Sequence, residues 1–180
     1  MVDELADRLG CRLRRRGRME ARAVQATWAG EPLWLVKPEG FMNNSGPVVA
    51  ALLGQQGLAA TDLVVVLDDA DLPLGRLRIR PRGGSGGHKG LSSIVAHVGT
   101  DEFARIRLGI GRGAGTTDLV THVLSAFTAD EWSAMQKVFV RAADAVEAVL
   151  TSGVDEAMNR FNAKGPDADA AEVPGAGGMQ

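Results

Sequence analysis

Apolar and polar positions along the chain predict strands that alternate with helices. Residues 63–67 form a continuous apolar run rich in β-branched side chains, which is typical of a strand covered on both faces. Apolar side chains at helical spacing predict a helix at the start of the chain and a long amphipathic helix over 129–150. We further predict strands over 21–28 and 33–36 around a turn at 30–32, a strand over 105–109, and helices over 48–55, 91–98 and 155–160. This alternation indicates an α/β fold, a three-layer α/β/α sandwich with a mixed, mostly parallel twisted sheet.

Composition divides the chain into one domain and a tail. The 180 residues are 45% apolar, and residues 1–164 are long enough to bury a core of their own. Residues 165–180 are mainly Gly, Ala, Pro and acidic residues without periodicity, so we predict a disordered acidic tail. No run of eighteen apolar residues is present, which argues against a membrane protein. The single Cys11 excludes an internal disulfide, and we expect a cytoplasmic protein.

The three histidines do not have the spacing of metal ligands, so we predict no metal site. His97 lies on a mostly apolar predicted helix, and His122 lies between a Thr and a Val. We interpret both as structural residues. His88 stands in a different context, next to a glycine-rich segment.

The basic residues are clustered although the formal net charge is only -2. One group near the start of the chain consists of Arg12, Arg14, Arg15, Arg16, Arg18 and Arg22. In a second group, Arg76, Arg78, Arg80 and Arg82 alternate with Leu, Ile and Pro. A period of two on a strand places all four guanidinium groups on one face. Because neighbouring like charges repel one another, we favour a phosphate-binding face over a solvated strand face.

Carboxylates follow directly after the apolar run at 63–67. Asp68, Asp69 and Asp71 stand where open α/β sheets place their ligands, and a polar turn accounts for them equally well. Both interpretations stay open on position alone.

The segment 41–46 combines apolar side chains with amides just before a predicted helix. Phe41 and Met42 can form an apolar wall beside the amide of Asn43. Asn44 or Ser45 can cap the helix, which explains one amide but not both. We therefore predict that this segment belongs to a binding site.

A glycine-rich loop at 83–87 precedes the helix predicted at 91–98. Its glycines let backbone N–H groups approach an anion closely. His88 and Lys89 follow the loop, but the Gly-Lys-Ser/Thr order of a Walker motif is missing, and a dinucleotide fingerprint fails as well. We favour a phosphate or sugar contact through His88 and Lys89 over a flexible linker.

Five short motifs follow one another along the chain. They are KP followed by FMNNSG within 37–46, DDADLPLG at 68–75, GGHKGL at 86–91, RIRLGIG at 105–111 and AMNRFN at 157–162. In these motifs and their spacing, residues 1–164 resemble bacterial peptidyl-tRNA hydrolase.

The resemblance implies hydrolysis of the ester between a peptide and the 3′ ribose of tRNA, which recycles the tRNA, with no metal and no organic cofactor. It implies that Asn43 positions substrate and water, that Asp68 orients a catalytic His, and that Phe41 and Met42 line the pocket. Lys89 stands where the family has an Asn that contacts the tRNA end. The implied contacts to the acceptor arm are Arg78, Arg80, Arg107 and Arg112. We expect a monomer whose partner is peptidyl-tRNA, with no membrane contact.

The start of the chain departs from the family pattern. Family members begin with a buried strand, a Gly-Asn-Pro-Gly loop and a segment whose His is the general base, whereas here no His precedes His88, a poor replacement. Without that strand, two neighbouring strands keep unpaired backbone groups, at about 1–3 kcal/mol for each buried group. We therefore favour an N-terminally shortened hydrolase whose catalytic His lies upstream of Met1. The alternative is a non-catalytic tRNA- or RNA-binding module that has lost the general-base His.

Overall fold

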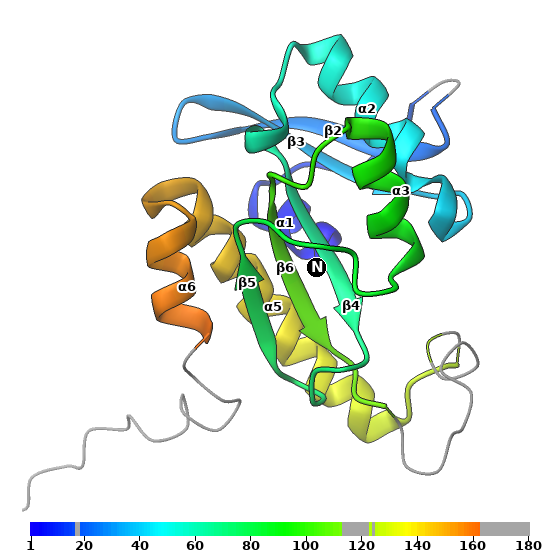
Figure 1. Ribbon diagram of the computed structural model, residues 1–180. Helices are drawn as coiled ribbons and strands as arrows, with labels where there is room; N and C mark the ends of the chain where they lie inside the picture. Colours follow the sequence, from blue (N-terminus) through cyan, green and yellow to red (C-terminus); the bar gives the residue numbers. More distant parts are fainter. Residues whose placement is uncertain (17–18, 113–122, 124, 163–180) are drawn as a thin grey trace, which may run out of the picture.

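The computed structural model describes residues 1–16, 19–112, 123 and 125–162, and its strands form two three-stranded sheets (Figure 1). The first sheet contains β1 (Arg14–Arg15), β2 (Ala21–Trp28) and β3 (Glu31–Pro38), in that order and all antiparallel. Residues 29 and 30 form the turn between β2 and β3, and both have positive φ, 50° at Ala29 and 91° at Gly30. Such a two-residue turn matches the twist of a hairpin. Strand β3 therefore begins at Glu31, two residues earlier than the pattern predicted.

The second sheet has the order β4-β6-β5. Strand β6 (Ala104–Gly109) lies between β4 (Val64–Asp69), to which it is parallel, and β5 (Leu77–Arg80), to which it is antiparallel. The sheet is thus mixed, as predicted. Among the described residues β4 and β6 form the only parallel pair, so the strand pairs are not mostly parallel. Strands β2 and β3 cannot be parallel, because a two-residue turn joins them, whereas the chain between β4 and β6 is long enough for the crossover that a parallel pair needs. Strand β5 runs against β6 although a helix lies between them in the sequence.

The described helices are α1 (Val2–Arg8), α2 (Ser45–Gln56), α3 (Lys89–Val98), α5 (Ala129–Ser152) and α6 (Val154–Asn162), with the 3-10 turns η1 (Met42–Asn44) and η2 (Ala60–Asp62). The predicted helices are present. Helix α3 begins two residues before the predicted start, because His88 caps it by accepting the Leu91 N–H.

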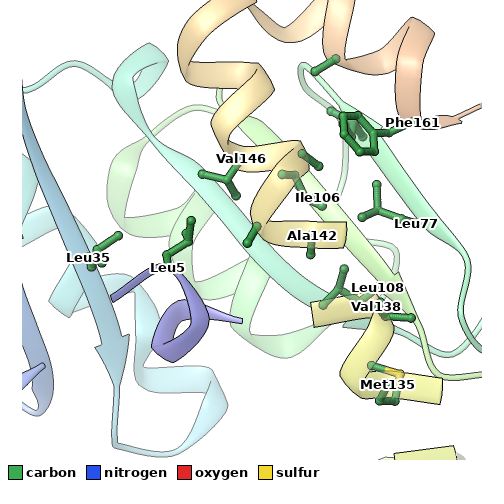
Figure 2. Close-up of a cluster of buried hydrophobic side chains, with 14 of the residues drawn as sticks. Leu5, Leu35, Leu77, Ile106, Leu108, Met135, Val138, Ala142, Val146 and Phe161 are labelled. Carbon is green, nitrogen blue, oxygen red and sulfur yellow. The ribbon is translucent and has the colours of Figure 1, made fainter. Parts of the chain in front are cut away.

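Two apolar cores cover the two faces of the second sheet, which confirms the α/β class. On one face, Leu77, Ile79, Ile106 and Leu108 pack against α5 and α6 in a cluster that also reaches α1 and the first sheet (Figure 2). On the other face, Leu67 and Phe103 pack against Leu91 and Ile94 of α3. The sheet thus separates α5 from α3 (Figure 1). The period of two in β5 produces this division, because its apolar side chains enter the first core and its arginines face the other way.

An ion-paired arginine attaches α1 to α5. Arg8 donates to Asp144 at 2.7 Å, to Glu147 at 3.0 Å and to the Val140 carbonyl at 3.1 Å. Leu5 and Ala6 of the same helix are buried beneath this contact. The start of the chain is therefore packed on the main core.

Two predictions fall on residues that the structure does not describe. They concern the disordered tail at 165–180 and the structural role of His122. Within the described helices, none is long and apolar enough to span a membrane.

Candidate active site

Three segments that are distant in the sequence meet beyond the C-terminal end of β4. Asp68 and Asp69 are the last residues of β4, and η1 packs against the start of α3. A Cβ atom added to Gly90 in the first turn of α3 would lie 2.8 Å from the Met42 sulfur and 3.1 Å from His88 Cε1. The Met42 side chain, Gly90 and the His88 ring are thus in direct contact. Parts of the predicted segments 41–46, 68–71 and 88–89 therefore lie side by side.

The imidazole of His88 uses both of its ring nitrogens. Nδ1 accepts the backbone N–H of Leu91 at 3.1 Å, and Nε2 lies 3.4 Å from Asp68 Oδ1. Because Nδ1 is an acceptor, the proton of the neutral ring is on Nε2 and points at the Asp68 carboxylate. The ring therefore has no free lone pair for a proton from water. In this geometry both ring nitrogens of His88 are engaged within the protein.

The hydrogen bond from His88 holds the pKa of Asp68 below the usual range of an Asp, while burial acts in the opposite direction. The ionised carboxylate stabilises the fold above the unfolded-state pKa of about 3.9. This contribution is lost as the pH falls through the lower folded-state pKa. Asp68 is consequently a carboxylate at neutral pH, which suits a group that orients a base.

We expect His88→Asn to raise the pKa of Asp68. Asn keeps a cap acceptor for Leu91, but it lacks the Nε2–H that favours the ionised acid, so the opposing effect of burial dominates. A carboxyl-carbon NMR titration measures this pKa. His97→Ala is the matched control, because His97 Nδ1 contacts the Ser93 carbonyl at 2.8 Å instead. An unchanged Asp68 pKa in His88→Asn would contradict the assigned hydrogen bond.

Arg107 connects the glycine-rich loop to the end of β4. Its guanidinium donates to Asp69 Oδ2 at 3.1 Å and to the Ser85 carbonyl at 3.4 Å. Its side chain is 24% exposed, and a Cβ on Gly86 would lie 3.0 Å from one of its nitrogens. Arg107 is thus partly neutralised within the protein, while its side chain stays partly exposed.

Arg105 is a buried residue behind the glycine-rich loop, and the sequence interpretation did not predict its burial. It is 1% exposed, and it donates to the carbonyls of Gly83, Asp101 and Phe103 while its guanidinium lies 4.5 Å over the Phe103 ring. Burial lowers the pKa of Arg105. Its Nε atom has no hydrogen-bond partner among the described residues. Arg105 holds the first residue of the loop against β6.

The arginine face of the second sheet differs from the predicted row of four. In the antiparallel register Arg78 is opposite Arg107 and Arg80 is opposite Arg105, so these four side chains share one face. Arg76 and Arg82 lie outside β5, which covers only Leu77–Arg80. Along that face, exposure falls from Arg78, which is exposed, to Arg80, which is half-buried.

The remaining predicted cations lie at the border of the site. Lys89 is exposed in the first position of α3. Arg112 is also exposed, and it donates to Asp71 Oδ1 at 2.5 Å. The two carboxylates that follow Asp68 therefore pair with arginines, Asp69 with Arg107 and Asp71 with Arg112.

The segment at 41–44 is open to solvent. Phe41 is 82% exposed and Met42 is 50% exposed, so the predicted apolar wall stands at the surface. Asn43 is exposed in η1. Neither Asn44 nor Ser45 caps α2 with its side chain, since Ser45 Oγ instead donates to the Met42 carbonyl at 2.9 Å. The cap explanation for these amides is therefore wrong.

Gly46 permits a close approach of α2 to α3. Its N–H donates to Ser93 Oγ at 3.0 Å, and a Cβ on Gly46 would lie 2.1 Å from the Ser93 carbonyl oxygen. This contact holds η1 beside the start of α3. Periodicity could not reveal it, because the glycine and the serine are 47 positions apart.

Together, the fold and the site define an α/β protein with a paired carboxylate and imidazole at a strand end and a cationic strand face beside them. The peptidyl-tRNA hydrolase family matches residues 1–169 of the chain. The chain belongs to this family.

Individual relatives agree with the family match. The peptidyl-tRNA hydrolase of Synechococcus sp. (strain JA-3-3Ab) is 42% identical over 177 residues, which cover 97% of this chain and 79% of the relative. That of Geobacillus thermodenitrificans is 41% identical over 90% of this chain and 87% of the relative. The crystal structure of peptidyl-tRNA hydrolase from Acinetobacter baumannii superposes with a TM-score of 0.84 at 30% identity, covering 92% of this chain and 84% of that one.

Proposed function

We propose that this protein hydrolyses the ester bond between the peptide and the tRNA in peptidyl-tRNA. Family membership supports the reaction, and the meeting of η1, the end of β4 and the start of α3 supports the place where it occurs. Water attacks the ester carbonyl while a base removes one of its protons. The bond between the carbonyl carbon and the 3′ ribose oxygen then breaks, and that oxygen takes up a proton and leaves as the hydroxyl of the tRNA. The released peptide carries the new carboxylate.

Within this proposal, each described site residue has a role that its position supports. Asn43 presents an exposed amide that orients the ester and the water, and Phe41 and Met42 contact the neighbouring end of the substrate. Asp68 is ionised and holds the base in its reactive orientation. Lys89 is exposed at the start of α3, where a cation attracts a phosphate.

The general base requires a separate proposal. Both ring nitrogens of His88 are occupied, and no His precedes it in the sequence. We propose that the base is a histidine N-terminal to Met1 and that it reaches the Asp68 carboxylate. The alternative function is a non-catalytic RNA-binding module, and the following experiment distinguishes it from a hydrolase.

The experiment compares residues 1–180 with a form that is extended by the upstream codons of its reading frame. With an N-blocked aminoacyl-tRNA as substrate, we expect the extended form to be faster by roughly 100-fold or more, the usual contribution of a general base. An upstream stop codon before any His codon would contradict the proposed base. Absence of hydrolysis by both forms would contradict the reaction itself.

In the active form, we expect Asn43→Ala to lower kcat by roughly 10- to 100-fold with little change in KM, because an orienting amide acts mainly in the transition state. Steady-state kinetics with the same substrate measure both constants. The comparison variant, Arg78→Glu with Arg80→Glu, should instead raise KM, because it removes phosphate contacts. A rise in KM alone for Asn43→Ala would assign Asn43 to binding and overturn its proposed role.

The tRNA contact falls on the arginine face of the second sheet. We propose that Arg78 and Arg80 contact the acceptor arm, and that His88, Arg107 and Arg112 border the path of its 3′ end. Unchanged tRNA affinity in the Arg78→Glu, Arg80→Glu variant would remove this surface from the proposal.

We also propose that the protein is a monomer and that it is located in the cytoplasm. Light scattering on the purified protein tests the oligomeric state.

A further inference from the structure

A second group of exposed cations lies on the first sheet, away from the arginine face of β5. Arg15, Arg22 and Lys37 form one row across β1, β2 and β3, since Arg15 is opposite Arg22 and Arg22 is opposite Lys37. The side chains of this row are 79%, 56% and 48% exposed, respectively. Arg14 and Arg16, whose side chains point to the other face of the sheet, are also exposed. We call these five residues, which surround the edge strand β1 from both faces of the sheet, the β1–β3 basic cluster.

Carboxylates neutralise only part of this cluster. Glu39 bridges Arg15 at 3.4 Å and Arg22 at 2.5 Å, and Asp3 binds Lys37 at 2.5 Å. Arg16 lies 4.7 Å over the Trp34 ring, which fixes the guanidinium at the surface without neutralising it. Within the described part of the chain, Arg14 and Arg16 have no acidic partner. In a chain of net charge -2, the cluster is thus a local excess of positive charge.

The β1–β3 basic cluster is close to the candidate active site along the chain. Lys37 is five residues before Met42, which contacts the start of α3, so these two residues are at most about 18 Å apart. In Figure 1, β1 lies at the end of the first sheet from which the chain continues to α2. Double-stranded DNA carries one phosphate charge about every 1.7 Å of its axis, so a duplex is densely charged over such a distance. A duplex whose 3′ end lies at the site can therefore present phosphates to the cluster.

We infer that the β1–β3 basic cluster is a second tRNA-binding surface, which contacts phosphates of the double-stranded part of the substrate and not its 3′ end. This inference rests on the proposed function for the identity of the RNA. None of the five residues is among the described contacts of Asp68, and the cluster lies on the other sheet. It therefore contributes to affinity and to orientation of the tRNA, and not to the chemical step.

The competing explanation is that the charges protect an edge strand. Strand β1 is at the edge of its sheet, and exposed charges on edge strands prevent pairing with another chain. That explanation predicts aggregation of neutralised variants and no specific effect on RNA. The two explanations therefore differ in a measurable quantity, the salt dependence of tRNA binding.

The test measures the affinity of Arg14→Gln, Arg16→Gln for deacylated tRNA over a range of salt concentrations. We expect binding about tenfold weaker near physiological salt, and a slope of log K against log salt that is smaller by about 1.4 to 1.8, since each lost phosphate contact contributes about 0.7 to 0.9. Binding of the 3′-terminal trinucleotide of tRNA should not change. The matched control is Lys137→Gln, Arg160→Gln, which removes the same charge from exposed positions on α5 and α6, including one arginine over an aromatic ring, Phe161.

An unchanged salt slope in Arg14→Gln, Arg16→Gln would overturn the inference and leave edge protection as the role of these charges. An equal loss in the control would also overturn it, because the effect would then be one of net charge. Weaker binding of the trinucleotide would place the contact at the 3′ end, against the inference. Absence of ester hydrolysis together with cluster-dependent tRNA binding would refute the proposed function and retain the inference.

Discussion

Gly46→Ala is expected to destabilise the protein by about 3 kcal/mol and to separate η1 from α3. The new Cβ would lie 2.1 Å from the Ser93 carbonyl oxygen and 2.6 Å from His97 Nδ1, and the first of these atoms belongs to the backbone of a packed helix. Ala gains about 1 kcal/mol of helix propensity over Gly, which is too little to offset the overlap. Urea denaturation measures the change in the free energy of unfolding.

The control for this prediction is in the same helix. Gly54 of α2 has no atom within 4 Å of an added Cβ, so Gly54→Ala gains the helix propensity without a clash. We expect it to stabilise the protein by up to about 1 kcal/mol. If Gly46→Ala were as stable as Gly54→Ala, the close crossing of α2 and α3 would be wrong.

Arg105→Met is expected to destabilise the protein by about 3 kcal/mol and to release the glycine-rich loop. Methionine fills a similar volume, but the carbonyls of Gly83, Asp101 and Phe103 then lose their donors. A buried polar group without a partner costs about 1–3 kcal/mol. Calorimetry measures the stability, and amide hydrogen exchange over residues 83–87 measures the release of the loop.

Arg78→Met is the matched control for Arg105→Met. Arg78 is on the same face of the sheet, one strand away, but it is exposed. A substitution at such a position changes stability by about 0.5 kcal/mol or less. Equal stability of the two variants would show that the buried guanidinium does not support the loop.

The patterns that predicted the fold correctly are local. The apolar run at 63–67 lies within β4 or directly before it, and helix α5 occupies 129–152 where periodicity predicted 129–150. Residues 21–28 form β2 with the predicted bounds. These signals are reliable because the period of apolar side chains follows directly from the geometry of one element.

The pairing of the strands was predicted less well. The hairpin of β2 and β3 and the return of β5 beside β6 produce antiparallel pairs, and the turn at Ala29 and Gly30 is one residue shorter than the predicted turn at 30–32. An apolar strand has the same sequence pattern whichever neighbour it joins. Strand direction depends on connections and on the second core, which a single period does not contain.

The sequence by itself pointed to most of the segments that the fold brings together around Asp68. Asp68 at the end of an apolar run, the FMN segment and the His-Lys pair after a glycine-rich loop could all be identified from residue type and position. Only the tertiary structure decided what these groups do to one another. It pairs His88 with Asp68 and with the Leu91 N–H, so the imidazole cannot accept a proton from water. It also buries Arg105 beneath the loop. Hydrogen-bond partners and burial depend on distances between segments tens of residues apart, and those distances exist only once the chain has folded.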